Sequence, residues 1–198
     1  MRTTVFIITL TSTFALLLSA CIQPIAPHTE TGDTPVAEMQ LNETFQFPDF
    51  GFAINHPTGW TVNTCPPAFV IAADPVDAEQ FCNSDAPPSD LAMGFDHRDL
   101  NFMRSIGLPA DATLDDLVAL NQREFGQEIL DDSETMLFGV PARRVRVAYD
   151  QGAAGIAYAG YLNDEAFLLS FDAPTAEALD MHLATIEAMV ASLRAIEE

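Results

Sequence analysis

Lysine is absent from this chain of 198 residues, so its eight basic residues are all arginine, set against 29 acidic residues. The formal net charge is −21. A surface of this sign repels nucleic acid phosphates and anionic lipid headgroups, which excludes nucleic acid as a partner. We interpret the acidic surface as a solubilising one, with attraction for cations or for a basic partner as the alternative.

Short motifs that mark common catalytic sites are missing as well. The chain has no Gly-x-Ser-x-Gly elbow, P-loop, dinucleotide-binding glycine pattern, His-Glu-x-x-His or EF-hand loop. We therefore predict that the protein is not an enzyme and uses no cofactor.

Long apolar runs are confined to the N-terminus. Residues 5–18 are apolar apart from a few Thr and Ser, and Arg2 precedes them. The run is shorter than the ~20 residues that span a bilayer, so residues 1–20 are predicted to be a signal peptide. Leu18-Ser19-Ala20-Cys21 resembles the lipobox of bacterial lipoproteins. The resemblance implies cleavage before Cys21, a diacylglycerol on its sulfur, and attachment to the extracytoplasmic face of a bacterial cell membrane; an ordinary signal peptide is the alternative.

Cysteine is scarce, with three residues in the chain. If Cys21 carries the lipid, Cys65 and Cys82 form an even pair in an oxidising compartment, and we predict a disulfide between them. Such a bond stabilises the fold by ~3 kcal/mol in the chain-entropy model. The alternative is a zinc site, which needs about four ligands and usually close pairs of them. Neither cysteine has a close Cys or His neighbour, so no metal is expected.

The mature chain divides into a tether and one domain. Residues 21–44 follow the signal peptide and contain the cysteine predicted to carry lipid, three prolines and many Thr and Glu residues. This composition predicts a flexible coil spanning about 25–30 Å. Residues 45–198 are long enough for a single globular domain with its own core.

Alternation of apolar residues and turn signals predict a mostly antiparallel sheet. We expect a hairpin of strands 50–54 and 60–62 around His56-Pro57-Thr58-Gly59, and further hairpins around Gly139 and Asn163-Asp164. The acidic stretch 73–90 is expected to be an insertion. The remaining predicted strands are 68–72, 91–95, 129–138, 142–149, 156–162 and 166–171, the last two central and covered on both faces.

Two long helices and one short helical turn are predicted. The first helix begins at Thr113, with an acid three residues on, and ends near Gly126. Its apolar face comprises Leu114, Leu117, Val118, Asn121 and Phe125. The second begins after Pro174 and buries Leu179, Leu183, Ile186, Val190 and Leu193. Residues 100–106 hold the short turn. Helices packed on a mostly antiparallel sheet define an α+β class.

Three stretches resemble the Mog1/PsbP-like group. They are the opening from Gly51 to Trp60, with its Pro-x-Gly-Trp end; Leu137-Phe138-Gly139-Val140-Pro141-Ala142-Arg143; and the final helix ending Val190-Ala191-Ser192-Leu193. The resemblance implies an α/β/α sandwich, with helices on the faces of the sheet. It also implies a binding or accessory role, because members of that group share no catalytic motif.

Candidate chemical groups are few and dispersed. His97 lies in Asp96-His97-Arg98-Asp99 at a strand end, where neighbouring side chains point to opposite faces and do not converge. His28, His56 and His182 are expected in the tether, in a turn and on a helix surface. Two acidic groups are candidates for a hard cation such as Ca²⁺, although neither has the spacing of a known loop. They are Asp131, Asp132, Ser133 and Glu134, and Asp74, Asp77, Glu79, Asp85 and Asp90. Arg143, Arg144 and Arg146 are expected to pair with carboxylates.

The sequence favours a lipid-anchored binding or accessory protein of the cell envelope, with a protein or small molecule as partner. The alternative is an envelope enzyme or cation-binding protein that uses scattered Asp and Glu residues with His97. A structural envelope protein without a ligand is the third hypothesis.

Overall fold

Two antiparallel sheets form the framework of the computed structural model, which describes residues 40–83 and 86–196. The larger sheet has the order β3 (Thr61–Cys65), β4 (Ala68–Ala72), β5 (Ala92–Asp99), β9 (Glu165–Ala173), β8 (Ala154–Leu162), β7 (Val140–Tyr149), β6 (Gln127–Leu137). The smaller sheet has the order β1 (Glu43–Phe47), β2 (Phe52–His56), β10 (Arg194–Ala195). The helices are α1 (Pro75–Phe81), α2 (Leu100–Ser105), α3 (Leu114–Phe125), α4 (Ala176–Met181) and α5 (Leu183–Ala191).

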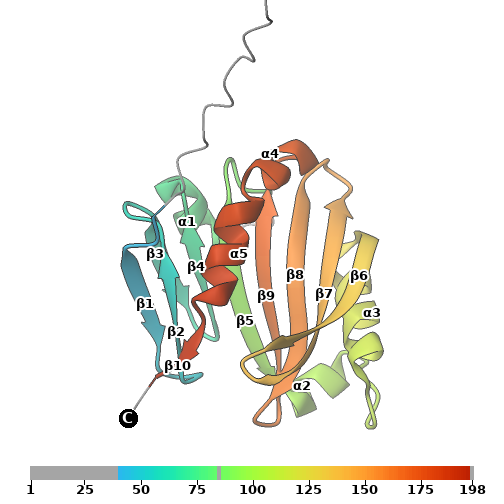
Figure 1. The fold of residues 1–198 in the computed structure, drawn as a ribbon. Coiled ribbons are helices and arrows are strands. Elements are labelled where there is room, and N and C mark those ends of the chain that lie inside the picture. Colours follow the sequence, from blue (N-terminus) through green and yellow to red (C-terminus); the bar gives the residue numbers. More distant parts are fainter. Residues whose placement is uncertain (1–39, 84–85, 197–198) are drawn as a thin grey trace, which may run out of the picture. The chain divides into compact units, whose positions relative to one another are not determined.

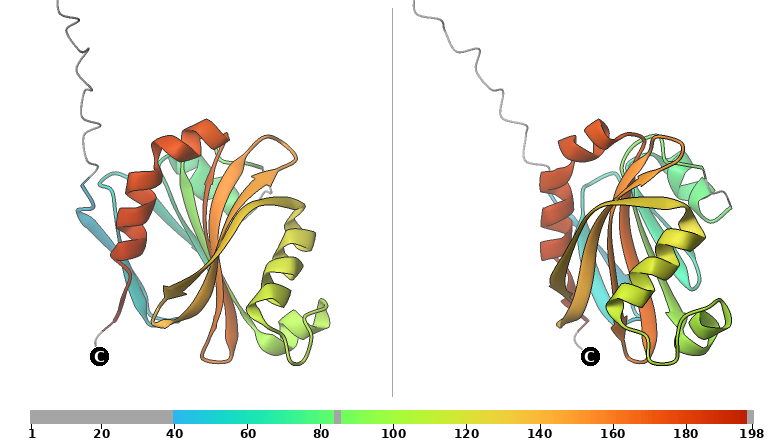
Figure 2. Two further views of the ribbon diagram at one scale, coloured as in Figure 1. Left: turned by 45° about the vertical axis from the view of Figure 1, so that its right-hand side comes forward. Right: turned by 90° about the vertical axis from the view of Figure 1, so that its right-hand side faces the viewer.

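Both faces of the larger sheet are covered (Figures 1 and 2). Helices α1, α2 and α3 lie on one face, and the smaller sheet with α4 and α5 lies on the other. Along β9, Phe167 and Phe171 contribute to the core under the smaller sheet, whereas Ala166 contributes to the core under α3. This is the period of two that a strand imposes on its side chains. The predicted α+β class, with a mostly antiparallel sheet and helices on its faces, is confirmed.

Phenylalanine dominates the core between the two sheets. Ring centroids lie 4.7 Å apart for Phe45 and Phe69 and 4.8 Å apart for Phe52 and Phe138, within the range in which aromatic pairs attract. Phe50, Phe95 and Phe167 extend the same cluster. The cluster joins the smaller sheet to β4, β5 and β9, so the sheets are held together mainly by burial of aromatic surface.

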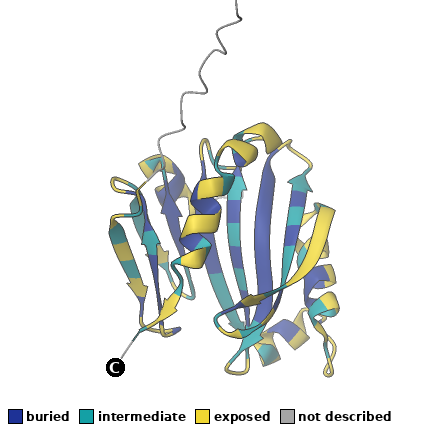
Figure 3. Ribbon diagram, viewed as in Figure 1, coloured by how far each residue is buried: buried dark blue, intermediate teal, exposed yellow. Residues whose placement is uncertain are grey.

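Two of the predicted hairpins are present. β6 pairs with β7 across Phe138-Gly139, and β8 pairs with β9 across Asn163-Asp164. All four of these turn residues have positive φ, the conformation that two-residue hairpin turns require. β8 and β9 are mostly buried, as predicted for central strands, whereas the edge strand β6 is mostly exposed (Figure 3).

The hairpin predicted around His56-Pro57-Thr58-Gly59 is wrong. β2 pairs with β1 and β10, while β3 pairs with β4, so this turn carries the chain from the smaller sheet to the larger one. β1 begins at Glu43, two residues inside the stretch predicted as tether. Glu43 and Thr44 are in the strand because they pair with His56 and Asn55 of β2.

The predicted insertion at 73–90 contains a helix that the sequence analysis missed. Asp74 is the N-cap of α1 and accepts a 2.8 Å hydrogen bond from the amide of Val76, and Pro75 occupies the first turn. This is a common helix start, because proline loses no hydrogen bond there. We predicted no helix here because the many acidic residues of the stretch make the short apolar face of the helix hard to recognise in the sequence.

The helix predicted after Pro174 is two helices. Thr175 caps α4 as expected, but the chain bends at His182, which ends α4 and begins α5. Because of the bend, Leu179 of α4 and both Ile186 and Met189 of α5 pack into the same core. The helix from Thr113 is confirmed, with a reciprocal capping box between Thr113 and Asp116 and a left-handed Gly126 at its end.

Candidate functional site

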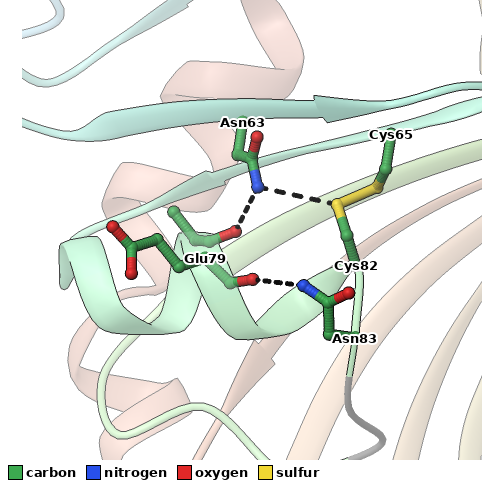
Figure 4. The surroundings of a disulfide bond; sticks show 6 residues. Asn63, Cys65, Glu79, Cys82 and Asn83 are labelled. Carbon is green, nitrogen blue, oxygen red and sulfur yellow. Dashed lines mark hydrogen bonds between the residues drawn. A yellow bond between two sulfur atoms is a disulfide. The ribbon is translucent and has the colours of Figure 1, made fainter.

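A disulfide joins Cys65 at the end of β3 to Cys82 at the end of α1 (Figure 4). The Nδ2 atom of Asn63 donates to the carbonyl oxygen of Ala78 at 2.9 Å and lies 3.7 Å from the Cys82 sulfur. The predicted disulfide is therefore present, and it fastens α1 to the edge of the larger sheet. Because the two sulfur atoms are bonded to each other, neither is a metal ligand.

Several residues singled out in the sequence lie outside the described residues. They are Cys21 with the signal and most of the tether, His28, and Asp85 of the acidic stretch.

His97 lies on the face of β5 that meets the smaller sheet. Its Nδ1 atom is 2.7 Å from Oε2 of Glu165 on β9, and its side chain is 14% exposed. The ring packs against Phe47 and Phe50, with centroids 5.7 and 5.1 Å away. Asp96 does not converge with His97, as strand geometry predicted. With its Nδ1 atom paired and its ring packed between phenylalanines, His97 fits a partly buried contact between strands better than a reaction centre.

The acidic groups are used in local hydrogen bonds and ion pairs. Asp77 accepts hydrogen bonds from the amides of Ser89 and Asp90, which ties the end of the 73–90 stretch to α1. Asp131 and Asp132 of β6 face the arginines of β7. Within residues 40–83 and 86–196, no group of three or more His, Cys, Asp or Glu side chains is arranged to hold a metal ion.

The arginines of β7 pair with carboxylates, as predicted. Arg143 contacts both Asp132 and Asp115, Arg144 lies 3.8 Å from Asp131, and Arg146 lies 2.7 Å from Asp180. These pairs connect β7 to β6, to the start of α3 and to α4. They leave no concentrated positive surface on this strand.

A pocket of about 300 Å³ opens between α2 and α3, above β5 and β9. We call it the α2–α3 groove and define it by Asp96, Arg98, Phe102, Ile106, Leu120 and Phe125. It is lined mostly by apolar side chains, and no His, Cys or Ser side chain lines it. The residues come from stretches far apart in the sequence, which is why sequence analysis did not group them.

Three large apolar side chains at the groove are left substantially exposed. The exposed fractions are 47% for Phe102, 36% for Ile106 and 53% for Phe125. Phe125 was predicted to lie on the buried face of α3, but Leu120 is buried in its place. The prediction failed at the last residue of the helix, where the Phe125 side chain is exposed. Contiguous exposed apolar surface of this kind commonly marks a binding site.

The walls of the groove are fastened by hydrogen bonds. The Nη2 atom of Arg123 on α3 donates to the carbonyl oxygen of Ile106 after α2, at 3.0 Å. The hydroxyl of Tyr161 on β8 donates to the carbonyl oxygen of Thr113, at 3.1 Å, and so holds the start of α3. The groove is therefore formed before any ligand arrives, which lowers the entropic cost of binding.

An ion pair forms one polar part of the groove, and Asn121 and Glu124 also line it. The Nε atom of Arg98 donates to Oδ2 of Asp96 at 2.9 Å, and the guanidinium lies 5.5 Å from the centroid of the Phe102 ring. Oδ1 of Asp96 is buried and has no hydrogen-bond partner among the described residues. Burial raises the pKa of Asp96, opposed by Arg98. The arrangement can bind an apolar group next to a polar contact, and it contains no paired nucleophile and base.

A second polar cluster, also missed in the sequence, lies on the helix-covered face of the larger sheet. The Tyr149 hydroxyl donates to Oδ1 of Asp172 at 2.7 Å, and the Ser170 hydroxyl donates to Oδ2 at 2.8 Å. Burial raises the pKa of Asp172, although both hydrogen bonds lower it. The sequence feature that could have indicated this cluster is the polar pair Ser170 and Asp172 in a mostly apolar strand. In the structure Gly155 lies opposite Asp172.

None of the described helices has the length and apolar character needed to cross a membrane.

Comparison with known proteins gives structural likeness without sequence similarity. No family model and no curated protein matches the chain. The solution structure of cyanobacterial PsbP (CyanoP) from Synechocystis sp. PCC 6803 is similar with a TM-score of 0.49 and 14% identity, covering 86% of this chain and 99% of that one. LpqN of Mycobacterium tuberculosis, described as involved in cell envelope biogenesis, is similar with a TM-score of 0.43 and 12% identity, covering 74% and 83%. Similarities of this size carry no function from those proteins to this chain.

Proposed function

We propose that the chain is a bacterial lipoprotein whose Mog1/PsbP-like domain is held at the extracytoplasmic face of the membrane by a lipid on Cys21. The domain acts as a binding or accessory protein and docks a protein partner in the α2–α3 groove. The lipobox residues support the anchor, and the three resembling stretches with the α+β arrangement support the domain type. The observation that carries the binding role is the set of three exposed apolar side chains around a preformed pocket.

Charge around the groove supports a protein as the occupant. Three of the seven described arginines lie on or beside it: Arg98, Arg104 and Arg123. They offset Asp96, Asp99 and Glu124 nearby, so the groove repels another acidic protein less than an uncompensated acidic surface would. A partner that inserts an aliphatic or aromatic side chain into the groove would bury Phe102 and Phe125. Aromatic anchors of this kind dominate the energy of many interfaces.

A binding role is better supported than the alternative of an enzyme that uses His97. The imidazole is enclosed by Phe47, Phe50 and Phe95, and Glu165 occupies its Nδ1 side. Neither residue lines the α2–α3 groove.

The experiment is cross-linking in native membranes with a photoreactive residue at position 102 of the full chain. The matched control carries the same residue at position 181, because Met181 on α4 is exposed and lies outside the groove. We expect a discrete adduct from position 102 and none from position 181. Phe125→Ser should abolish the adduct, and Met181→Ser, at another exposed position, should leave it unchanged.

Equal cross-linking from both positions, or an adduct that survives Phe125→Ser, would rule out the groove as the docking site. Because Phe102 and Phe125 are about half exposed, substitution of either is expected to lower the free energy of unfolding by only about 1 kcal/mol. Loss of the adduct would therefore report loss of the contact and not loss of the fold.

A further inference from the structure

The longest strand of the larger sheet lies at its edge. β6 has 11 residues, whereas β3 at the opposite edge and β1 at one edge of the smaller sheet have 5 residues each. β6 ends the sheet order and pairs with β7 alone among the described strands. We propose that the edge of β6 binds an extended segment of a basic partner protein, which adds to the sheet as a further strand. No residue of β6 lines the α2–α3 groove, so this surface is separate from the docking site proposed above.

The β6–β7 turn determines which backbone groups of β6 point outward. Leu137 and Val140 flank a two-residue turn, and the residues that flank such a turn exchange both backbone hydrogen bonds. Bonded and non-bonded pairs then alternate along the antiparallel ladder. The N–H and C=O groups of Asp132, Glu134 and Met136 therefore point away from β7. All three residues are exposed, so these groups are accessible to an added strand.

A bulge interrupts β6 near its start and leaves the rest of the edge regular. The register with β7 shifts between Ile129 and Asp131, and a bulge discourages further pairing where it lies. From Asp131 to Leu137 each residue has one partner on β7. This stretch is longer than the typical strand of about 5–6 residues, so it can serve as a template for another strand.

Every charged residue of β6 is acidic. The residues are Glu128, Asp131, Asp132 and Glu134, and all four are exposed. Arginines of β7 lie within ion-pair distance of Asp131 and Asp132, but they are one strand farther in and only 18–29% exposed. A strand added at the edge therefore lies beside the carboxylates. Opposite charges on neighbouring strands stabilise their pairing, whereas like charges oppose it.

Charge distinguishes a basic partner from a second copy of this chain. Two copies paired through β6 would place carboxylates opposite carboxylates, and each copy has a formal net charge of −21. Because successive side chains of a strand alternate, Asp131 and Asp132 lie on opposite faces of β6. Lysine or arginine residues of an added strand therefore meet a carboxylate on either face. This inference is independent of the lipid anchor and of the α2–α3 groove.

Titration with a basic peptide tests the proposal. The probe is an acetylated and amidated octapeptide in which lysine alternates with threonine, and the control peptide has glutamate in place of lysine. The full chain is carried in nanodiscs of zwitterionic lipid, and empty nanodiscs serve as the blank. We expect saturable one-to-one binding of the lysine peptide by calorimetry, and binding of the glutamate peptide weaker by about tenfold or more.

Amide hydrogen exchange at single-residue resolution distinguishes strand addition from simple charge attraction. Saturating lysine peptide should slow exchange at Asp132, Glu134 and Met136, because an added strand accepts hydrogen bonds from their N–H groups. Exchange at Ser133 and Thr135, whose N–H groups point toward β7, should change less. Binding without this alternation would overturn the proposal, and so would the absence of saturable binding above the blank.

A matched pair of substitutions separates the backbone contact from the charge. Glu134→Pro and Glu134→Thr both remove the carboxylate, but only proline also removes the outward N–H. Proline loses no hydrogen bond to β7 at this position and is tolerated on edge strands. Glu134→Pro should bind the lysine peptide about tenfold or more weakly than Glu134→Thr.

A thermal unfolding scan checks that both variants are folded. Equal affinity in the two folded variants would contradict strand addition at β6. If Glu134→Pro does not fold, the exchange pattern of the wild type decides the question.

Discussion

The hydroxyl of Tyr149 on β7 donates a 2.7 Å hydrogen bond to Asp172 on β9, although β8 runs between the two strands. The bond crosses β8 at Gly155, where an added Cβ atom would overlap Oδ1 of Asp172. A carboxyl group with two neutral donors, and no basic partner among the described residues, is thus held on the helix-covered face of the larger sheet. The contact makes Asp172 a suitable position for testing how a buried carboxyl group changes the stability of the fold with pH.

Asp172→Asn should become more stabilising relative to wild type as pH rises. Burial raises the pKa of Asp172 in the folded state above its ordinary value of 3.8, so the folded protein retains a proton that the unfolded chain releases. The contribution of this group to stability is therefore full below about pH 4 and is lost as pH rises through the folded-state pKa. The loss is about 1.4 kcal/mol for each unit by which the pKa is raised.

Urea unfolding of both proteins between about pH 4 and about pH 8 measures this difference. Asp111→Asn, at an exposed turn position, is the control and should show no such trend. A difference between Asp172→Asn and wild type that stays constant with pH would contradict the assignment.

Gly155→Ala should destabilise the protein by about 1–3 kcal/mol, because the added methyl group overlaps the Asp172 carboxyl and approaches the carbonyl oxygen of Phe171 at 3.2 Å. Part of this cost belongs to the contact with Asp172. In an Asp172→Ala background the same substitution should therefore cost less, and a double-mutant cycle measured by urea unfolding gives the coupling. Additive costs would show that the two residues do not compete for the same space.

Removing the disulfide should lower stability without removing the fold. Cys65→Ser with Cys82→Ser opens a covalent loop between positions 17 residues apart, which costs about 3 kcal/mol in the chain-entropy model. The midpoint of urea unfolding should fall accordingly. Thiol labelling of the denatured, non-reduced mature domain should find neither cysteine free, and stoichiometric labelling would contradict the bond.

Cys21→Ala should release the protein from membranes or leave it unprocessed, because the proposed lipid has no other attachment point. Fractionation of cells followed by mass measurement of the chain distinguishes the two outcomes. The Cys65→Ser, Cys82→Ser variant, which retains Cys21, should stay in the membrane fraction. A processed Cys21→Ala protein that remains bound to membranes would refute the lipoprotein proposal.

Features that depend on neighbouring residues were predictable from the sequence. The cap of α3 at Thr113 and Asp116, its end at Gly126 and the turn at Asn163-Asp164 are each specified within four residues, and all are present. The predicted hairpin after β2 failed for the opposite reason. The residues near His56 do not indicate that β2 pairs with β1 and β10, and β10 lies almost 140 residues farther along the chain.

The α+β class, several caps and turns, the pairing of Cys65 with Cys82 and an anchor at Cys21 could all be predicted from the sequence. Each of these depends on residue type and short spacing. The structure was needed to show that Phe102 and Phe125 share an exposed groove and that Tyr149 contacts Asp172 across β8. These are long-range contacts, set by strand order and packing, and a local pattern contains no information about which distant segment covers it.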